Sequence, residues 1–197
     1  CGDDGDDNPA DNGGNGGNTS GASSKGSLGT HTGNNTVVTS DNAQEVSGII
    51  MGKASEVFSR ALQLAVAGKP AAGTTMNIDG KVNGNKGGYA QSKGTMSYST
   101  TGATTYNITC TFYDFSDDGQ LFLGGQLTFD GSVKYGTNNQ MESQTIKIKG
   151  GLKFNGTYIG QEVFSTTVTV NSTGGVTYAG TTTVTSGGET FTYNYSY

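Results

Sequence analysis

The residue types that carry most enzyme chemistry are scarce in this sequence, which has one His, two Cys and no Trp among 197 residues. Because His31 lies in a stretch of Gly, Asn and Thr, we expect no Ser–His or Cys–His pair for nucleophilic catalysis. No spacing of Cys, His and carboxylates is typical of a metal site. The sequence therefore predicts a protein that is not an enzyme and that has no cofactor and no metal.

Long apolar runs and an excess of positive charge are also missing. No segment approaches the roughly 20 apolar residues of a membrane-spanning helix. The formal net charge is −5, and most of it lies in the first forty residues, which contain five Asp and one Lys. The nearly neutral remainder has no basic surface of the kind that binds nucleic acid, so we expect no nucleic-acid partner.

What the sequence has in abundance is glycine, with 34 residues, and it divides the chain into two parts. Residues 1–40 are almost all Gly, Asn, Asp, Ser and Thr, a composition that cannot bury enough apolar surface to offset the entropy of ordering. Residues 41–197 hold nearly every large apolar side chain. We predict a disordered tether over 1–40 and a single helix-plus-antiparallel-β domain over 41–197.

The first residues resemble a known class of protein. Cys1 is followed by Gly2 and by the acidic stretch Asp3-Asp4-Gly5-Asp6-Asp7, and this resembles the mature end of a bacterial outer-membrane or surface lipoprotein. The resemblance implies a removed signal peptide, a lipid on Cys1 and a location in the cell envelope, at the outer membrane or cell surface. It covers only the N-terminal Cys and the tether, and it identifies no domain family.

One helix is predicted, over residues 41–68. Apolar side chains recur there at helical spacing, and Gly68-Lys69-Pro70 is typical of a helix end. The apolar stripe is narrow and rich in Ala, so we expect it to pack under another element. Gly48 and Gly52 weaken the helix by roughly 1 kcal/mol each, and we expect something to pack closely against that part of it.

From Thr74 onward the apolar residues alternate with polar ones, which is typical of strands with one buried face. The predicted strands cover residues 74–83, 89–100, 104–116, 120–135, 141–154, 157–170, 176–185 and 189–197. Short connections make neighbours in sequence antiparallel neighbours in space. We predict a mainly β fold with one N-terminal helix, in which an eight-stranded up-and-down meander curves strongly, as a half-barrel or open barrel, and packs on the helix. The alternative is a closed, lipocalin-like β-barrel.

The turns predict how the strands pair. A two-residue turn at Asp118-Gly119 places Cys110, a predicted core residue, opposite Leu127. A similar turn at Asn155-Gly156 places Leu152 opposite Ile159, and this register requires a β-bulge near Val163-Phe164. A repeated mid-strand glycine, at positions 80, 131, 150 and 180, indicates a bend, a bulge or the close approach of another backbone. Three aspartates at one hairpin end, Asp114, Asp117 and Asp118, are interpreted as turn residues.

These features predict a membrane-anchored cell-envelope lipoprotein that acts as a non-catalytic binding or structural module. Its expected partners are the membrane, through the lipid anchor, and a lipid, glycan or envelope-protein ligand. One alternative is a carrier of an apolar ligand in a cavity between sheet and helix, with candidate lining residues Ile50, Val57, Phe58, Tyr106, Ile108, Leu127, Phe129, Ile148, Leu152, Tyr178 and Tyr195. Another is an integral outer-membrane β-barrel, because the ending Phe191-x-Tyr193-x-Tyr195-x-Tyr197 resembles the C-terminal signal of that class.

Overall fold

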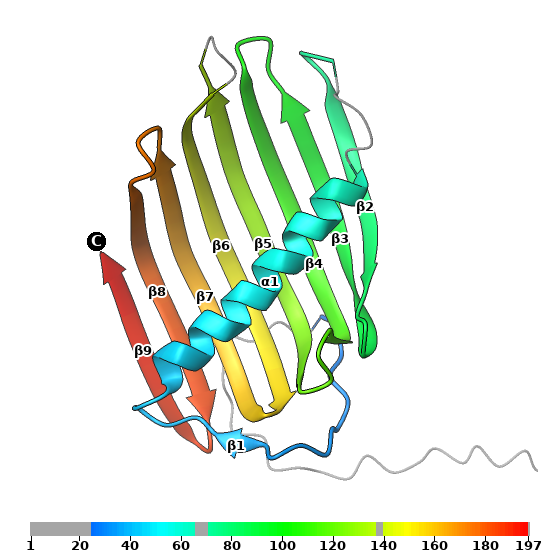
Figure 1. The fold of residues 1–197 in the computed structure, drawn as a ribbon, viewed down its shortest axis with the longest axis vertical. Coiled ribbons are helices and arrows are strands. Elements are labelled where there is room, and N and C mark those ends of the chain that lie inside the picture. Colours follow the sequence, from blue (N-terminus) through cyan, green and yellow to red (C-terminus); the bar gives the residue numbers. More distant parts are fainter. Residues whose placement is uncertain (1–24, 66–70, 137–139, 197) are drawn as a thin grey trace, which may run out of the picture.

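The computed structural model describes residues 25–65, 71–136 and 140–196. One helix lies diagonally across one face of a broad antiparallel sheet (Figure 1). The helix is α1 (Ala43–Ala65). The strands are β1 (Thr36–Val37), β2 (Thr75–Asn83), β3 (Gly87–Tyr98), β4 (Ala103–Ser116), β5 (Leu121–Tyr135), β6 (Met141–Gly156), β7 (Tyr158–Asn171), β8 (Val176–Ser186) and β9 (Glu189–Ser196).

The predicted meander is confirmed. Strands β2 to β9 pair in sequence order, and each begins and ends within two residues of its predicted position. The helix begins at Ala43 and is described to Ala65, while the predicted end at Gly68-Lys69-Pro70 lies outside the described residues. Clear alternation of apolar and polar residues was sufficient to place these strands, because one face of each is buried and the other is wet.

The sheet is open, so the strong curvature and the closed barrel predicted from the sequence are both wrong. Within the described strands, β2 and β9 form the two ends of the meander. The mid-strand glycines explain part of this difference between the predicted and the observed sheet, because two of them make room for a neighbouring ring or carbonyl group. Gly131 lies under the ring of Tyr106, and Gly80 faces the carbonyl oxygen of Ala61 in the helix. The other two, Gly150 and Gly180, have φ angles of 132° and 131°.

The predicted pairing of β4 with β5 is confirmed, with Cys110 opposite Leu127. The predicted pairing of β6 with β7 is wrong: Leu152 lies opposite Glu162, and no bulge occurs at Val163-Phe164. Strand β6 continues through Gly156 because residues before the helix bond to it. The N–H of Asn35 donates to the Gly156 carbonyl (2.7 Å), and the Gly156 N–H donates to Asn35 Oδ1 (3.0 Å).

Residues 25–37 form an N-terminal strap that lies along the sheet, so the predicted tether is too long at its C-terminal end. Strand β1 pairs in parallel with β7, and the Ser27 carbonyl accepts the N–H of Asp114 (2.7 Å). The ring of His31 stacks on Phe122 with centroids 3.4 Å apart, and its Nε2 lies 2.7 Å from Asp114 Oδ1. His31 is therefore packed against the domain. Residues 1–24 lie outside the described residues.

The core lies between α1 and the inner face of the sheet, which is the face that the helix covers. Ile50, Ala54 and Val57 on the helix are fully buried. Phe58, also on the helix, stacks on Phe129 of β5 with centroids 4.3 Å apart. Ile108, Leu127, Phe129 and Ile148 share this buried face, as the alternation predicts.

One side of the diagonal helix is sealed by the β4–β5 hairpin. The apolar residues there form a closed wedge in which every side chain is at most 3% exposed: Val82, Ala90, Phe112, Phe115, Leu121, Leu123 and Phe154. Two ion pairs hold the hairpin tip against the helix, between Lys53 and Asp118 (2.6 Å) and between Arg60 and Asp117 (2.7 Å). The pKa of Asp118 is lowered despite partial burial, because Lys53 and the N–H groups of Leu121 and Gln120 stabilise its charge.

We predict opposite effects for one substitution at two glycines. Gly150→Ala forces a Cβ to 2.2 Å from the Gln126 carbonyl oxygen at a positive φ, and the free energy of unfolding falls by roughly 1–3 kcal/mol. Gly52→Ala adds a Cβ that meets no atom within 4 Å, and the free energy rises by about 1 kcal/mol because Ala favours the helix. Urea denaturation measures both, and a stabilised Gly150→Ala variant contradicts the glycine assignment.

Candidate functional site

The other side of the helix is open. Two pockets, of about 430 and 470 Å³, lie between α1 and the inner face of the sheet. The first is lined by Gln44, Ser47, Gly48, Met51, Gly52, Ile148, Phe164, Thr166, Val168, Tyr178 and Thr182. The second is lined by Phe58, Leu62, Gln63, Met96, Tyr98, Thr104, Tyr106, Val133, Tyr135 and Gln144. We call these two pockets together the groove.

The two pockets follow one another along the same elements. On β6, Gln144 lines the second pocket and Ile148 the first, with the partly buried Ile146 between them on the same face. On α1 the lining residues run from Gln44 to Gln63, which is about 29 Å of helix at 1.5 Å per residue. The two pockets therefore lie in line along one side of the helix.

The structure divides the predicted cavity-lining residues into two sets. Ile148 and Tyr178 line the first pocket, and Phe58 and Tyr106 line the second. The remaining residues whose side chains are described are packed in the core at 0–1% exposure: Ile50, Val57, Ile108, Leu127, Phe129 and Leu152. The side chain of Tyr195 lies outside the described residues. The space predicted at the centre of the domain is filled, and the open space lies along one side of the helix.

Phe164, Thr166 and Val168 also line the groove, although they are not among the lining residues predicted from the sequence. The structure places all three on the inner face, opposite Gly150, Ile148 and Ile146. The pairing of Val168 with Tyr178 across β7 and β8 was the signal that could have found them, since it puts both residues on one face.

Two glycines of the helix face the groove. Gly48 and Gly52 are one turn apart, both are exposed, and a Cβ at either position meets no other atom within 4 Å. The prediction that another element packs closely against them is wrong within the described structure. Each glycine weakens the helix by about 1 kcal/mol relative to Ala, and no contact in the described domain offsets this cost. Their effect is to widen the groove.

A buried carboxyl group lies beside the first pocket. Glu162 on β7 is fully buried, and its Oε1 accepts a hydrogen bond from the hydroxyl of Ser47, which lines that pocket. Its Oε2 has no hydrogen-bond partner. Burial raises the pKa of Glu162 from its ordinary value of 4.5 to about 8, and the bond from Ser47 opposes that rise. Glu162 is therefore mostly neutral at pH 7.

The other side chains that could react or bind a metal ion have structural explanations. Cys110 is fully buried, as predicted, and burial raises the pKa of its thiol to about 11 while a hydrogen bond from Ser92 opposes the rise. Among the described residues, no group of three or more His, Cys, Asp or Glu is placed to hold a metal ion. The lipidation predicted at Cys1 stays a prediction, because Cys1 lies outside the described residues.

Comparison of this chain with family models, curated proteins and solved structures finds no match. In the described part of the chain, no helix has both the length and the apolar character needed to cross a membrane.

We predict that Glu162→Gln changes how stability depends on pH. The unfolded chain loses this proton near pH 4.5, whereas the folded domain keeps it up to about pH 8. Wild-type stability from this group is highest below pH 4.5 and falls by up to about 1.4 kcal/mol per pH unit as the pH rises toward 8. The Gln variant lacks this loss, so its free energy of unfolding rises relative to that of wild type as the pH increases.

Urea denaturation between pH 5 and pH 8 measures the free energy of unfolding of wild type and of Glu162→Gln. Titratable groups that the substitution does not affect contribute equally to both values and cancel in the difference. Glu189→Gln is the matched control, because Glu189 is exposed, and its difference from wild type stays constant. A constant difference for Glu162→Gln contradicts the assignment of a neutral buried carboxyl group.

Proposed function

We propose that this chain is a non-catalytic binding module that holds an elongated apolar ligand, of the acyl-chain class, in the groove. The observation that carries the proposal is the open flank of α1, where Gly48 and Gly52 face empty space above an apolar floor. The apolar surface that stays open to water there, as at Val168 and Tyr178, costs free energy, and a bound acyl chain would cover it.

The composition of the groove supports an apolar ligand. Its floor is formed by Ile148, Phe164 and Val168 near one end of the helix and by Tyr106 and Val133 near the other. No Asp, Glu, Lys or Arg is among the residues that line either pocket. Pockets for small ligands are mostly apolar, with a few polar groups that fix orientation.

Amide groups are present at both ends of the groove. Gln44 lies at its start on α1 and Gln63 at its other end, while Gln144 lies on β6, the strand that both pockets share. Amide side chains both donate and accept hydrogen bonds, so either end is suited to the polar head group of a ligand whose chain lies between them. An elongated molecule with one polar end fits this arrangement better than a compact one.

The open sheet favours this proposal over an integral β-barrel. A spanning barrel needs a closed sheet so that every backbone group is paired, whereas β2 and β9 end the meander in the described structure. The lipid anchor expected at Cys1 would keep the module at a membrane, where acyl chains are abundant. That part of the proposal depends on the resemblance alone.

We predict that Gly48→Leu with Gly52→Leu abolishes ligand binding without unfolding the domain. The two side chains enter space that holds no protein atom, and Leu favours the helix over Gly by about 1 kcal/mol per site. Binding of a long-chain fatty acid, measured by displacement of a fluorescent acyl probe, weakens by about tenfold or more. Thermal stability stays the same or rises.

Glu56→Leu is the matched control. Glu56 is exposed on the same helix and does not line the groove, so the variant adds the same apolar side chain and keeps the affinity of wild type. Wild-type protein that binds no fatty acid, or a double variant that binds as tightly as wild type, overturns the proposal.

A further inference from the structure

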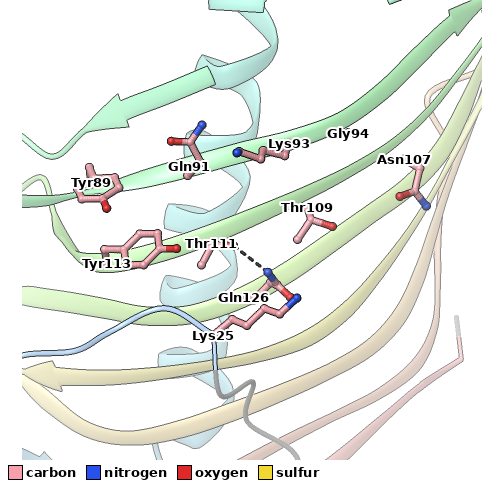
Figure 2. Close-up of a pocket in the computed structure, with 10 residues that line it drawn as sticks. All are labelled: Lys25, Tyr89, Gln91, Lys93, Gly94, Asn107, Thr109, Thr111, Tyr113 and Gln126. Atoms are coloured by element: carbon pink, nitrogen blue, oxygen red, sulfur yellow. Dashed lines mark hydrogen bonds between the residues drawn. The ribbon is translucent and has the colours of Figure 1, made fainter. Parts of the chain in front are cut away.

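A third pocket, of about 630 Å³, lies on the face of the sheet opposite α1, and it differs in chemistry from the groove (Figure 2). It is lined by side chains of β3, β4 and β5 and by Lys25 at the start of the N-terminal strap. The lining residues are Lys25, Tyr89, Gln91, Lys93, Gly94, Asn107, Thr109, Thr111, Tyr113 and Gln126. No aliphatic side chain other than the lysine stems is among them, and no carboxylate.

Two stacked tyrosines form one end of this pocket. Tyr89 and Tyr113 are direct partners across β3 and β4, and their ring centroids lie 4.8 Å apart at an interplanar angle of 23°. Lys81 Nζ lies 4.0 Å from the centroid of Tyr89. Figure 2 shows the two rings side by side, with the polar side chains extending away from them along the strands. Tyr89 has Tyr113 stacked against its ring and Lys81 over it, so Tyr113 is the ring that can offer an aromatic face at the end of a polar trough.

A backbone irregularity holds one of these rings in place. The pairing of β4 with β5 shifts between Phe112 and Phe115, and Asp114 within this bulge has a φ of 55°. A residue other than Gly in this region is strained and persists only where its surroundings fix it. Here the Asp114 N–H donates to the Ser27 carbonyl (2.7 Å), and Asp114 Oδ1 accepts the N–H of Gly29 (2.9 Å).

The strap thus fixes the bulge that directly follows Tyr113 in the chain. Bulges re-aim side chains and are frequent beside binding sites. The contact is close, because a Cβ on Gly26 would lie 2.4 Å from the Phe112 carbonyl oxygen. Residues 25–29 therefore both wall the pocket, through Lys25, and anchor the strand that presents Tyr113.

The rest of the trough is formed by amides and hydroxyls. Gln91, Asn107 and Gln126 contribute amide groups, and Thr109 and Thr111 contribute hydroxyls. Gln126 Nε2 donates to Thr111 Oγ1 (2.8 Å), which fixes the orientation of that amide (Figure 2). Amides and hydroxyls each donate and accept, and they match a ligand whose own groups also do both.

We propose that this pocket binds an oligosaccharide. A pyranose ring has an apolar C–H face that packs on an aromatic ring, whose π-face is electron-rich, and its hydroxyl groups donate and accept hydrogen bonds. The ring of Tyr113, supported by the stacked ring of Tyr89, receives the ring face of the sugar. The amides of Asn107 and Gln126 pair with hydroxyls of the sugar units along the trough. This site is independent of the groove, because it lies on the other face of the sheet.

Screening of the full chain against an array of neutral and uronate-containing oligosaccharides, followed by titration calorimetry of the best binder, tests the proposal. Tyr89→Ala and Tyr113→Ala each weaken binding by about tenfold or more, because a ring that anchors an interface contributes over 1 kcal/mol. Tyr113→Phe keeps the ring and stays within about threefold of wild type. Asn107→Ala, at an exposed position, weakens binding while leaving the fold intact.

Two controls separate this site from general effects. Thr169→Ala changes a hydroxyl of the same kind on β7, outside the residues that line the pocket, and binding stays at the wild-type level. The double variant of Gly48 and Gly52 keeps its saccharide affinity, even where it has lost fatty-acid binding. An array without any binder, or binding that survives the loss of both tyrosine rings, overturns the proposal.

Discussion

One helix must cover the inner face of eight strands, and it is too narrow to do so. At 4.8 Å per strand the face is about 34 Å wide, whereas a helix with its side chains is about 10 Å across. By lying diagonally, α1 touches strands near both edges but leaves a triangular area on each side (Figure 1). The architecture of the domain follows from how these two areas are treated, because apolar surface left in water costs free energy in proportion to its area.

The two areas are treated differently. On one side, large aromatic side chains fill the closed wedge, and Arg60 and Lys53 draw the β4–β5 hairpin against the helix. On the other side, the helix presents Gly48 and Gly52, and Val168 and Tyr178 stay partly or largely exposed beside the buried Ile148 and Phe164. The apolar ligand that we propose would complete the second side as the hairpin completes the first. The neutral Glu162 carboxyl lies beneath this open side, where its charge would be costly.

The sequence was sufficient to predict the strands, their order and the register of β4 with β5, because one apolar side chain in two specifies a half-buried strand. It was not sufficient where a distant segment decided the outcome. The turn after Phe154 looked like a short hairpin at Asn155-Gly156, but Asn35 bonds to Gly156 and extends β6. His31 was predicted to lie in the tether, but its ring stacks on Phe122, an apolar residue on the solvent-facing side of the sheet. The sheet's openness and the groove's position depend on the width of the helix and on the angle at which it crosses the strands. The alternation of apolar and polar residues does not encode either of these.

The most direct test of this account is the reactivity of single cysteines placed on the two sides of the helix, in a protein whose Cys1 is replaced by Ser. Thr166→Cys lies in the groove, and Ala90→Cys lies in the closed wedge, where the side chain is fully buried. Native Cys110 is buried and adds little background. The account predicts that a thiol reagent labels Thr166→Cys about a hundredfold or more faster than Ala90→Cys, because only the second position must wait for local unfolding. Equal rates at the two positions would contradict it, since the helix would then cover both sides alike or neither.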